Sequence, residues 1–109
     1  CDYFNIKLGK SGGIFKALKM VRMAEEAVIN LQVGAMLESR LGMTAFAHFA
    51  LCSPNIEHYD FDTALMFTQD PVTGGIQYKA NGVVEVPESI GLGATIDDRW
   101  LSKMKKVVI

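Results

Sequence analysis

The chain has 109 residues, of which 50% are hydrophobic and 21% charged, and its formal net charge is −1. This composition is typical of a globular domain and excludes an intrinsically disordered chain. The absence of a basic block argues against nucleic-acid binding, and no apolar run approaches the roughly 20 residues that a membrane span needs. The two cysteines do not make a disulfide framework, which favours free thiols and a cytoplasmic protein.

Strands and helices are expected to alternate along the first part of the chain. Short apolar, β-prone runs predict strands, and apolar residues at helical spacing predict helices. The predicted strands are residues 3–8, 31–34 and 56–61, and the predicted helices are residues 14–27 and 38–51. Val33 follows Ile6 by 27 positions, and Asp60 follows Val33 by 27. This regular strand–helix repeat predicts parallel strands joined by right-handed crossovers.

The character of the sequence changes after residue 62. Residues 63–86 are rich in Gly and Thr, and two alternating stretches flank the pair Asn81-Gly82, which predicts a β-hairpin. Residues 87–97 are expected to form an irregular loop, and residues 97–105 a short helix. Three strands with helices do not close a barrel. The pattern therefore fits either a small open α/β domain or the last part of a larger barrel.

Lys7 lies at the end of the first predicted strand. Because successive strand residues point to opposite faces, Asn5 and Lys7 share one face, whereas Ile6 and Leu8 share the other. Barrel enzymes place catalytic groups at the carboxyl ends of their strands. The alternative is a surface lysine that extends into solvent from an edge strand. The pattern alone leaves both interpretations open.

Two acids end the third predicted strand. Asp60 and Asp62 are two positions apart and so share a face, where they could bind a cation or an ammonium group. The alternative is a polar strand end in which Asp62 and Thr63 cap a helix. Glu38 lines a pocket or is an ordinary first-turn helix acid. His48, on an apolar helix face, is predicted to be a core histidine rather than a ligand.

Five segments of the chain carry a family resemblance: "NIKLGKSGG", "QVGAMLESRLG", "AHFA", "YDFDTALM" and "GLG". They occur in order over nearly the whole chain. Together they resemble the C-terminal part of the enolase superfamily, in its muconate-lactonizing subgroup. The segment "DFD" makes the chain most similar to the dipeptide epimerases (the L-Ala-D/L-Glu type) within that subgroup.

The resemblance implies an α/β fold. Residues 1–68 would be the last three βα units, strands six to eight, of a modified TIM-type (β/α)7β barrel. Residues 69–109 would be a tail that packs on the barrel and returns to an α+β capping domain. The rest of the enzyme would lie upstream of this chain.

The resemblance also implies an activity, that of a Mg²⁺-dependent isomerase. Such an epimerase or racemase acts on the α-carbon of a dipeptide through an enediolate, and uses one lysine on each face of that carbon as acid and base. Lys7 matches one of these catalytic lysines. The other implied site residues are Asp60 and Asp62, which would hold the substrate's ammonium group, Ala35 and Leu37, which would shape the pocket, and Glu38 and Asn5, as further pocket residues.

The second lysine and the acidic Mg²⁺ ligands would lie upstream, so no metal ligand is expected in this chain. The expected partners are a small-molecule dipeptide or other carboxylate, the missing N-terminal part of the same enzyme, and further copies in a homo-oligomer. The isolated chain is expected to be inactive. Alternatives are a muconate-type cycloisomerase, an o-succinylbenzoate synthase, or an inactive fragment or assembly module without a metal site.

Val28 departs from the family pattern, which has Gly at this position after the first helix. Gly suits the left-handed conformation of a helix C-terminus, whereas a β-branched residue does not. We therefore expect either a different helix end or local backbone strain at Val28.

Overall fold

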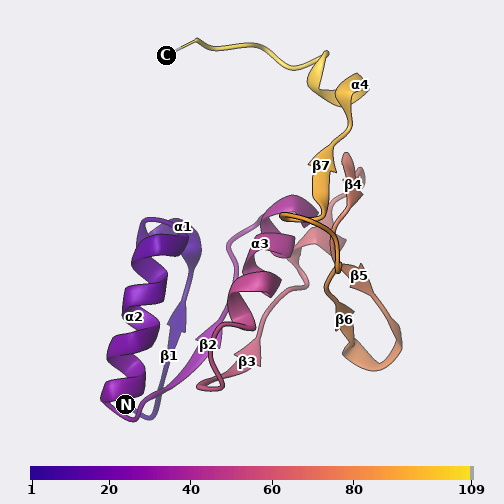
Figure 1. Ribbon diagram of the computed structural model, residues 1–109. Helices are drawn as coiled ribbons and strands as arrows, with labels where there is room; N and C mark the ends of the chain where they lie inside the picture. The colour runs from indigo at the N-terminus through magenta and orange to yellow at the C-terminus, as the bar shows by residue number, and fades with distance from the viewer. Residues whose placement is uncertain (109) are drawn as a thin grey trace.

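The computed structural model, which describes residues 1–108, has a three-stranded parallel sheet covered on one face by helices (Figure 1). The strand order is β1-β2-β3. The elements of this part are β1 (Tyr3–Ile6), α1 (Leu8–Ser11), α2 (Ile14–Glu26), β2 (Asn30–Val33), α3 (Arg40–Ala50) and β3 (Ile56–Tyr59). The predicted alternation of strands and helices and the parallel pairing are confirmed.

The core lies between the sheet and its two long helices. The faces of α2 and α3 that are buried against the strands carry small and large apolar side chains in alternation, which lets the layers interdigitate. The buried apolar residues are Ala17, Val21 and Ala24 of α2, Met43, Phe46, Ala47, Phe49 and Ala50 of α3, and Ile6, Leu31, Val33 and Ile56 of the sheet. The opposite face of the sheet carries Asn5, which is exposed.

The strands predicted at residues 3–8 and 56–61 extend two residues too far at their carboxyl ends. β1 ends at Ile6 because the carbonyl oxygen of Lys7 accepts the N–H groups of Lys10 and Ser11, each at 2.9 Å, which starts the one-turn helix α1. β3 ends at Tyr59. Within the sheet Val33 pairs with Tyr59, one position before Asp60, and the register between β2 and β3 shifts between Leu31 and Gln32.

The tail forms two small antiparallel pairs. β4 (Val72–Gly74) pairs with β7 (Ala94–Ile96), and β5 (Gln77–Tyr78) pairs with β6 (Val84–Glu85). The predicted hairpin is confirmed, but its turn is the 3-10 segment η2 (Ala80–Gly82). The prediction of a loop over residues 87–97 is wrong at Ala94–Ile96, which form β7. The last helix, α4 (Asp98–Leu101), is shorter than predicted.

Arg40 attaches the tail to α3. Its guanidinium contacts the carboxylate of Asp70 and the backbone carbonyls at both ends of β4. One turn later, the hydroxyl of Thr44 accepts the N–H of Ile76 at 3.0 Å, and Thr44 and Ile76 are fully buried. These contacts fix residues 70–76 against the first turns of α3.

Helix α2 ends in a left-handed turn at Val28, whose φ is +55°. The N–H of Ile29 donates to the carbonyl of Ala24 at 2.9 Å, and the N–H of Val28 donates to the carbonyl of Glu25 at 3.2 Å. This pair of bonds is the Schellman motif, whose left-handed position usually carries Gly. The helix therefore ends in the usual way, and the predicted strain lies at the exposed Val28.

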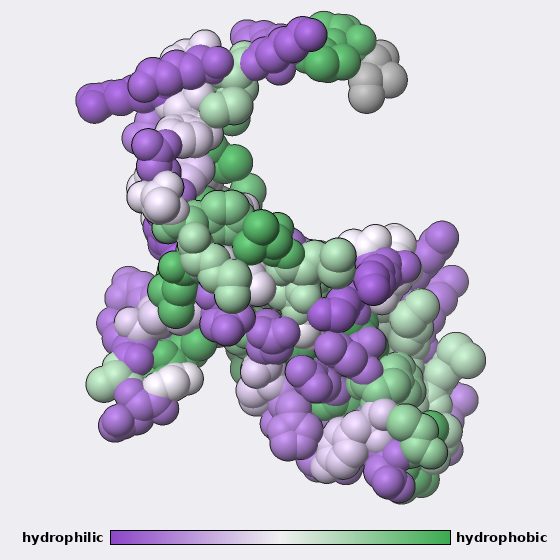
Figure 2. All heavy atoms as spheres, turned by 180° about the vertical axis from the view of Figure 1, so that it is seen from behind, coloured by the Kyte–Doolittle hydropathy of each residue, from purple (hydrophilic) through white to green (hydrophobic). Residues whose placement is uncertain are grey.

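The C-terminal segment after β7 extends away from the sheet (Figure 1). Seen from behind, hydrophobic side chains gather where this segment and the β5–β6 hairpin meet the body of the molecule (Figure 2). Within residues 1–108, none of the helices has the length and apolar character needed to cross a membrane.

Candidate active site

The parallel register brings Lys7, Gly34 and Asp60 to one edge of the sheet. Ile6 pairs with Val33, and Val33 pairs with Tyr59, so the residues that follow these three lie side by side. The N–H of Gly34 donates to the carbonyl of Ile6 at 3.2 Å, and the N–H of Asp60 donates to that of Val33 at 2.9 Å. The carboxyl edge of the sheet therefore carries a cation and an anion from strands that are not neighbours.

The Lys7 side chain lies across this edge. It is half-buried, and its Nζ donates a hydrogen bond to the carbonyl oxygen of Ala35, 2.6 Å away. Its backbone carbonyl is also fixed, because the hydroxyl of Ser11 donates to it at 2.9 Å. A lysine that extends into solvent would leave its ammonium group free of such contacts. Lys10, in the following turn, is exposed.

Asn5 and Asp60 converge above Gly34. A Cβ atom on Gly34 would lie 2.9 Å from the Asn5 amide nitrogen and 3.3 Å from a carboxylate oxygen of Asp60. Gly34 thus leaves room for a neutral amide and a carboxylate to approach each other from β1 and the end of β3. The predicted alternation holds for Ile6, which lies between Asn5 and Lys7 and is buried in the core, whereas Leu8 is buried as the first residue of α1.

The segment between β2 and α3 borders the same edge. Ala35 is buried and reaches the site through its carbonyl, whereas Leu37 is 64% exposed. The prediction that Glu38 lies in the helix is wrong, because α3 begins only at Arg40. The Glu38 carboxylate instead lies over the neighbouring turn, with one oxygen 4.0 Å from where a Cβ atom of Gly9 would be.

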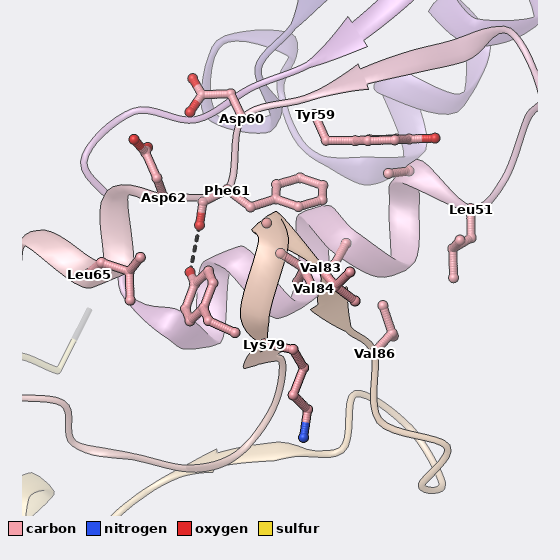
Figure 3. A pocket seen from close by; sticks show the side chains of 14 residues that line it. Leu51, Tyr59, Asp60, Phe61, Asp62, Leu65, Lys79, Val83, Val84 and Val86 are labelled. Carbon is pink, nitrogen blue, oxygen red and sulfur yellow. Dashed lines mark hydrogen bonds between the residues drawn. The ribbon is translucent and has the colours of Figure 1, made fainter.

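Asp62 lies beyond the end of β3 and precedes the 3-10 segment η1 (Thr63–Met66). The side chain of Asp62 makes no hydrogen bond that caps η1. In Figure 3 the carboxylates of Asp60 and Asp62 point away from a hollow, while the ring of Phe61 points toward it. This agrees with the predicted shared face of the two acids.

The hollow in Figure 3 has a volume of about 660 Å³ and is open to solvent. It lies between α3, the end of β3 and the β5–β6 hairpin. Its walls are mainly apolar, and they include Leu51, Tyr59, Phe61, Leu65, Val83, Val84 and Val86. The two acids therefore lie on the border between the polar edge of the sheet and an apolar depression.

Tyr78 contacts the loop that carries the two acids, a contact that sequence reasoning missed. Its hydroxyl donates to the carbonyl of Phe61 at 2.5 Å. Burial, and secondarily the negative charge of Asp62, raise the pKa of the Tyr78 phenol. Only its place in an alternating hairpin stretch marks Tyr78 in the sequence. Gly34 could have been found, because it follows Lys7 by one 27-residue repeat.

No metal site forms among residues 1–108, where no three His, Cys, Asp or Glu side chains gather closely enough to hold an ion. His48 is half-buried, and its Nε2 lies 3.2 Å from the carbonyl oxygen of Leu92. Residues 1–108 therefore do not by themselves provide a set of side chains that fits Mg²⁺.

Comparison with known proteins shows the family of this chain. The family model "Enolase C-terminal domain-like" matches residues 1–100, and the chain belongs to this family. It is 56% identical over 109 residues to the D-Ala-D/L-Ala epimerase of Cytophaga hutchinsonii, covering 100% of this chain and 30% of that protein. It is 46% identical over 92 residues to the L-Ala-D/L-Glu epimerase of Bacillus subtilis, covering 84% of this chain and 25% of that enzyme.

A solved structure shares the fold closely. The dipeptide epimerase from Cytophaga hutchinsonii, complexed with Mg and the dipeptide D-Ala-L-Val, superposes with a TM-score of 0.95 over 98% of this chain and 29% of that one, at 56% identity. The chain thus spans less than a third of the length of the relatives that it matches.

Proposed function

We propose that this chain is the C-terminal part of a dipeptide epimerase, in which Lys7 is one of two acid/base lysines. The observation that carries the proposal is the placement of the Lys7 ammonium group and the Asp60 carboxylate at one carboxyl edge of the sheet, on either side of Gly34. The D-Ala-D/L-Ala epimerase of Cytophaga hutchinsonii, which is 56% identical to this chain, supports the proposal.

Each group at the edge has a chemical role in this proposal. Lys7 Nζ removes the α-proton of the dipeptide on one face of the carbon, or returns it, and a second base acts on the other face. The enediolate that forms between these steps loses the original configuration. Asp60 and Asp62 accept hydrogen bonds from the N-terminal ammonium group, and charge-assisted bonds of this kind are the stronger ones.

Three further groups complete this side of the proposed pocket. Asn5, beside Asp60, offers an amide that can donate or accept. Leu37 supplies an exposed apolar wall, and the Ala35 carbonyl holds the ammonium form of Lys7 until substrate replaces that contact. Glu38 borders the turn at Gly9.

The proposed architecture is a modified (β/α)7β barrel. Residues 1–68 would supply its sixth to eighth strands, and residues 69–109 a tail that returns to a capping domain. The sheet supports this, because β1 and β3 each have an unpaired outer edge and its polar face has no covering layer within the described chain. The C-terminal segment that projects from the body supports a contact with another part of the protein.

Mg²⁺ is proposed as the cofactor of the complete enzyme, held by residues outside this chain. It would supply charge stabilisation when the α-proton leaves. The isolated 109-residue chain is accordingly proposed to be inactive.

The test is α-proton exchange by the complete enzyme that carries this chain. The enzyme is incubated with Mg²⁺ in D₂O with a panel of dipeptides that includes Ala-Ala and L-Ala-L-Glu, and α-deuterium and the second epimer are followed by NMR. We expect both to appear with at least one dipeptide. If no dipeptide exchanges, the proposal is wrong, and exchange with a muconate or succinylbenzoate precursor instead would indicate another activity of the subgroup.

A further inference from the structure

The two acids of the proposed ammonium site are held by different parts of the molecule. The N–H of Asp60 donates to the carbonyl of Val33 at 2.9 Å, so the parallel sheet fixes Asp60. Asp62 lies past the last such bond. Its own carbonyl accepts the N–H of Leu65 at 2.9 Å, a bond within the same turn. The sheet therefore does not determine where Asp62 lies.

The tail makes the contact that the sheet does not provide. The Tyr78 hydroxyl donates to the carbonyl of Phe61, the peptide unit that joins Phe61 to Asp62, at 2.5 Å (Figure 3). Because a carbonyl has no proton, the phenol must be the donor. Tyr78 itself is fixed in β5, where it pairs with Val84 of β6. A second contact joins Thr63 to the backbone of Glu38, but at 3.4 Å it is longer.

We propose that Tyr78 is a positioning residue, whose hydroxyl holds the Phe61–Asp62 peptide unit so that the Asp62 carboxylate faces the substrate's ammonium group. This rests on the proposed epimerase function. Tyr78 does not touch substrate, and it acts only through Asp62. The hairpin of the tail thus sets the geometry of one half of the ammonium site, while the sheet sets the other half.

The surroundings keep the phenol protonated. Burial raises the pKa of Tyr78 most, and the negative charges of Asp62 and Asp70 raise it further, against the opposing effect of Arg40. A raised pKa keeps Tyr78 neutral beyond its ordinary value near 10, so it remains a donor throughout the physiological range.

A simpler role would be that the hydroxyl satisfies a buried carbonyl and contributes only to stability. Tyr78→Phe keeps the ring and removes only the hydroxyl, so both roles predict some loss of stability. Only the positioning role predicts that the loss of substrate affinity depends on the charge of Asp62. The two roles are therefore separated by a double-mutant cycle, not by one substitution.

In the complete enzyme, we expect Tyr78→Phe to raise KM for a free dipeptide about three- to tenfold, with kcat within about twofold. In an Asp62→Asn background, the same substitution should change KM less than about 1.5-fold, since the positioned charge is already gone. Equal effects of Tyr78→Phe in both backgrounds, or no effect on KM in either, would overturn the proposal.

Tyr59→Phe is the matched control. The Tyr59 hydroxyl also donates to a backbone carbonyl, that of Ile56 at 2.8 Å, but β3 already fixes this stretch in the sheet. We expect its KM to equal that of the unmodified enzyme. A rise in KM as large as that caused by Tyr78→Phe would count against the special role of Tyr78.

Amide hydrogen exchange gives a readout that does not depend on activity. In Tyr78→Phe we expect the peptide covering residues 61–65 to exchange at least about threefold faster, while residues 31–34 of the sheet are unchanged. If the unmodified enzyme exchanges no dipeptide, the proposed function fails, and this measurement still decides the proposal about Tyr78. Unchanged exchange at residues 61–65 would overturn it.

Discussion

The Nζ of Lys7 donates a hydrogen bond to the carbonyl oxygen of Ala35, 2.6 Å away across the edge of the sheet. The bond joins the end of β1 to the residue that follows β2 by two positions. It holds the ammonium group at the same edge as Asp60, although Lys7 and Asp60 come from the outer strands of the sheet.

Lys7→Ala should abolish epimerisation by the complete enzyme. Loss of a general acid/base group costs about 10²- to 10⁴-fold in kcat, and the second base cannot complete the reaction alone. That second base should still exchange the α-proton of one epimer with D₂O, which chiral separation and NMR can measure. Lys10→Ala, an exposed lysine in the following turn, should retain full activity. Full epimerisation by Lys7→Ala would exclude Lys7 as a base.

Asp60→Asn and Asp62→Asn should each lower kcat/KM for a free dipeptide. A charge-assisted hydrogen bond is worth about 1.5–3 kcal/mol, which corresponds to a loss of about 10- to 100-fold. An N-acetylated dipeptide has no ammonium group, so its binding, measured by calorimetry, should not weaken. If both ligands lose affinity equally, the two acids do not recognise the ammonium group.

Gly34→Ala should impair activity with little effect on folding. The added methyl group would lie 2.9 Å from the Asn5 amide and 3.3 Å from the Asp60 carboxylate, so these side chains must move apart. Displacements of this size in a site cost about 10- to 100-fold in rate. Gly9→Ala is the control, because its methyl group would meet no atom closer than 4.0 Å. Equal kcat/KM values for the two variants would contradict the predicted crowding.

Val28→Gly should stabilise the protein. A residue other than Gly in the left-handed region costs about 1–2 kcal/mol, and the greater freedom of Gly in the unfolded chain offsets part of the gain. The net increase in the free energy of unfolding should be about 1 kcal/mol, measured by urea denaturation. Ala27→Gly, one residue earlier at a right-handed φ of −86°, should instead destabilise by about 0.5–1 kcal/mol. Destabilisation by Val28→Gly would show that the left-handed turn is not strained.

Arg40→Met should lower the free energy of unfolding more than the loss of an exposed ion pair does. The substitution leaves Asp70 and the carbonyls at both ends of β4 without their shared donor, at a cost of about 2–3 kcal/mol in urea denaturation. Lys79→Met is the control, because Lys79 and Glu85 are 46% and 59% exposed and their 3.0 Å pair should contribute less than about 1 kcal/mol. Equal losses would mean that Arg40 does not anchor the tail.

Local pattern sufficed for much of the fold. Apolar periodicity located both long helices and all three parallel strands, and the side-chain alternation at Asn5, Ile6 and Lys7 correctly separated the polar face from the core face. These features depend on residues within one or two turns of each other, which a single sequence contains. The family resemblance, not local pattern, marked Val28 as a departure from glycine, and the structure places it in a left-handed turn.

The ends of the helices and strands do not follow from the sequence pattern. β1 stops at Ile6 because the Lys7 carbonyl bonds to a turn, and α3 starts at Arg40 rather than at Glu38. The register shift that pairs Val33 with Tyr59 moves the strand partner by one position and has no local marker in the sequence. β7 forms in a stretch whose sequence pattern predicts a loop. Pairing with β4, about twenty residues earlier in the chain, makes this stretch a strand.

The sequence by itself determined the α/β class, the parallel strands, the family, and the candidate groups Lys7, Asp60 and Asp62, because periodicity and short motifs are local properties of the chain. Only the tertiary structure decided how those groups meet. The Lys7 bond to Ala35, the space above Gly34 and the Tyr78 hydroxyl at Phe61 all join residues that are far apart in sequence. Such contacts arise from strand register and from the packing of the tail, and no local pattern specifies either.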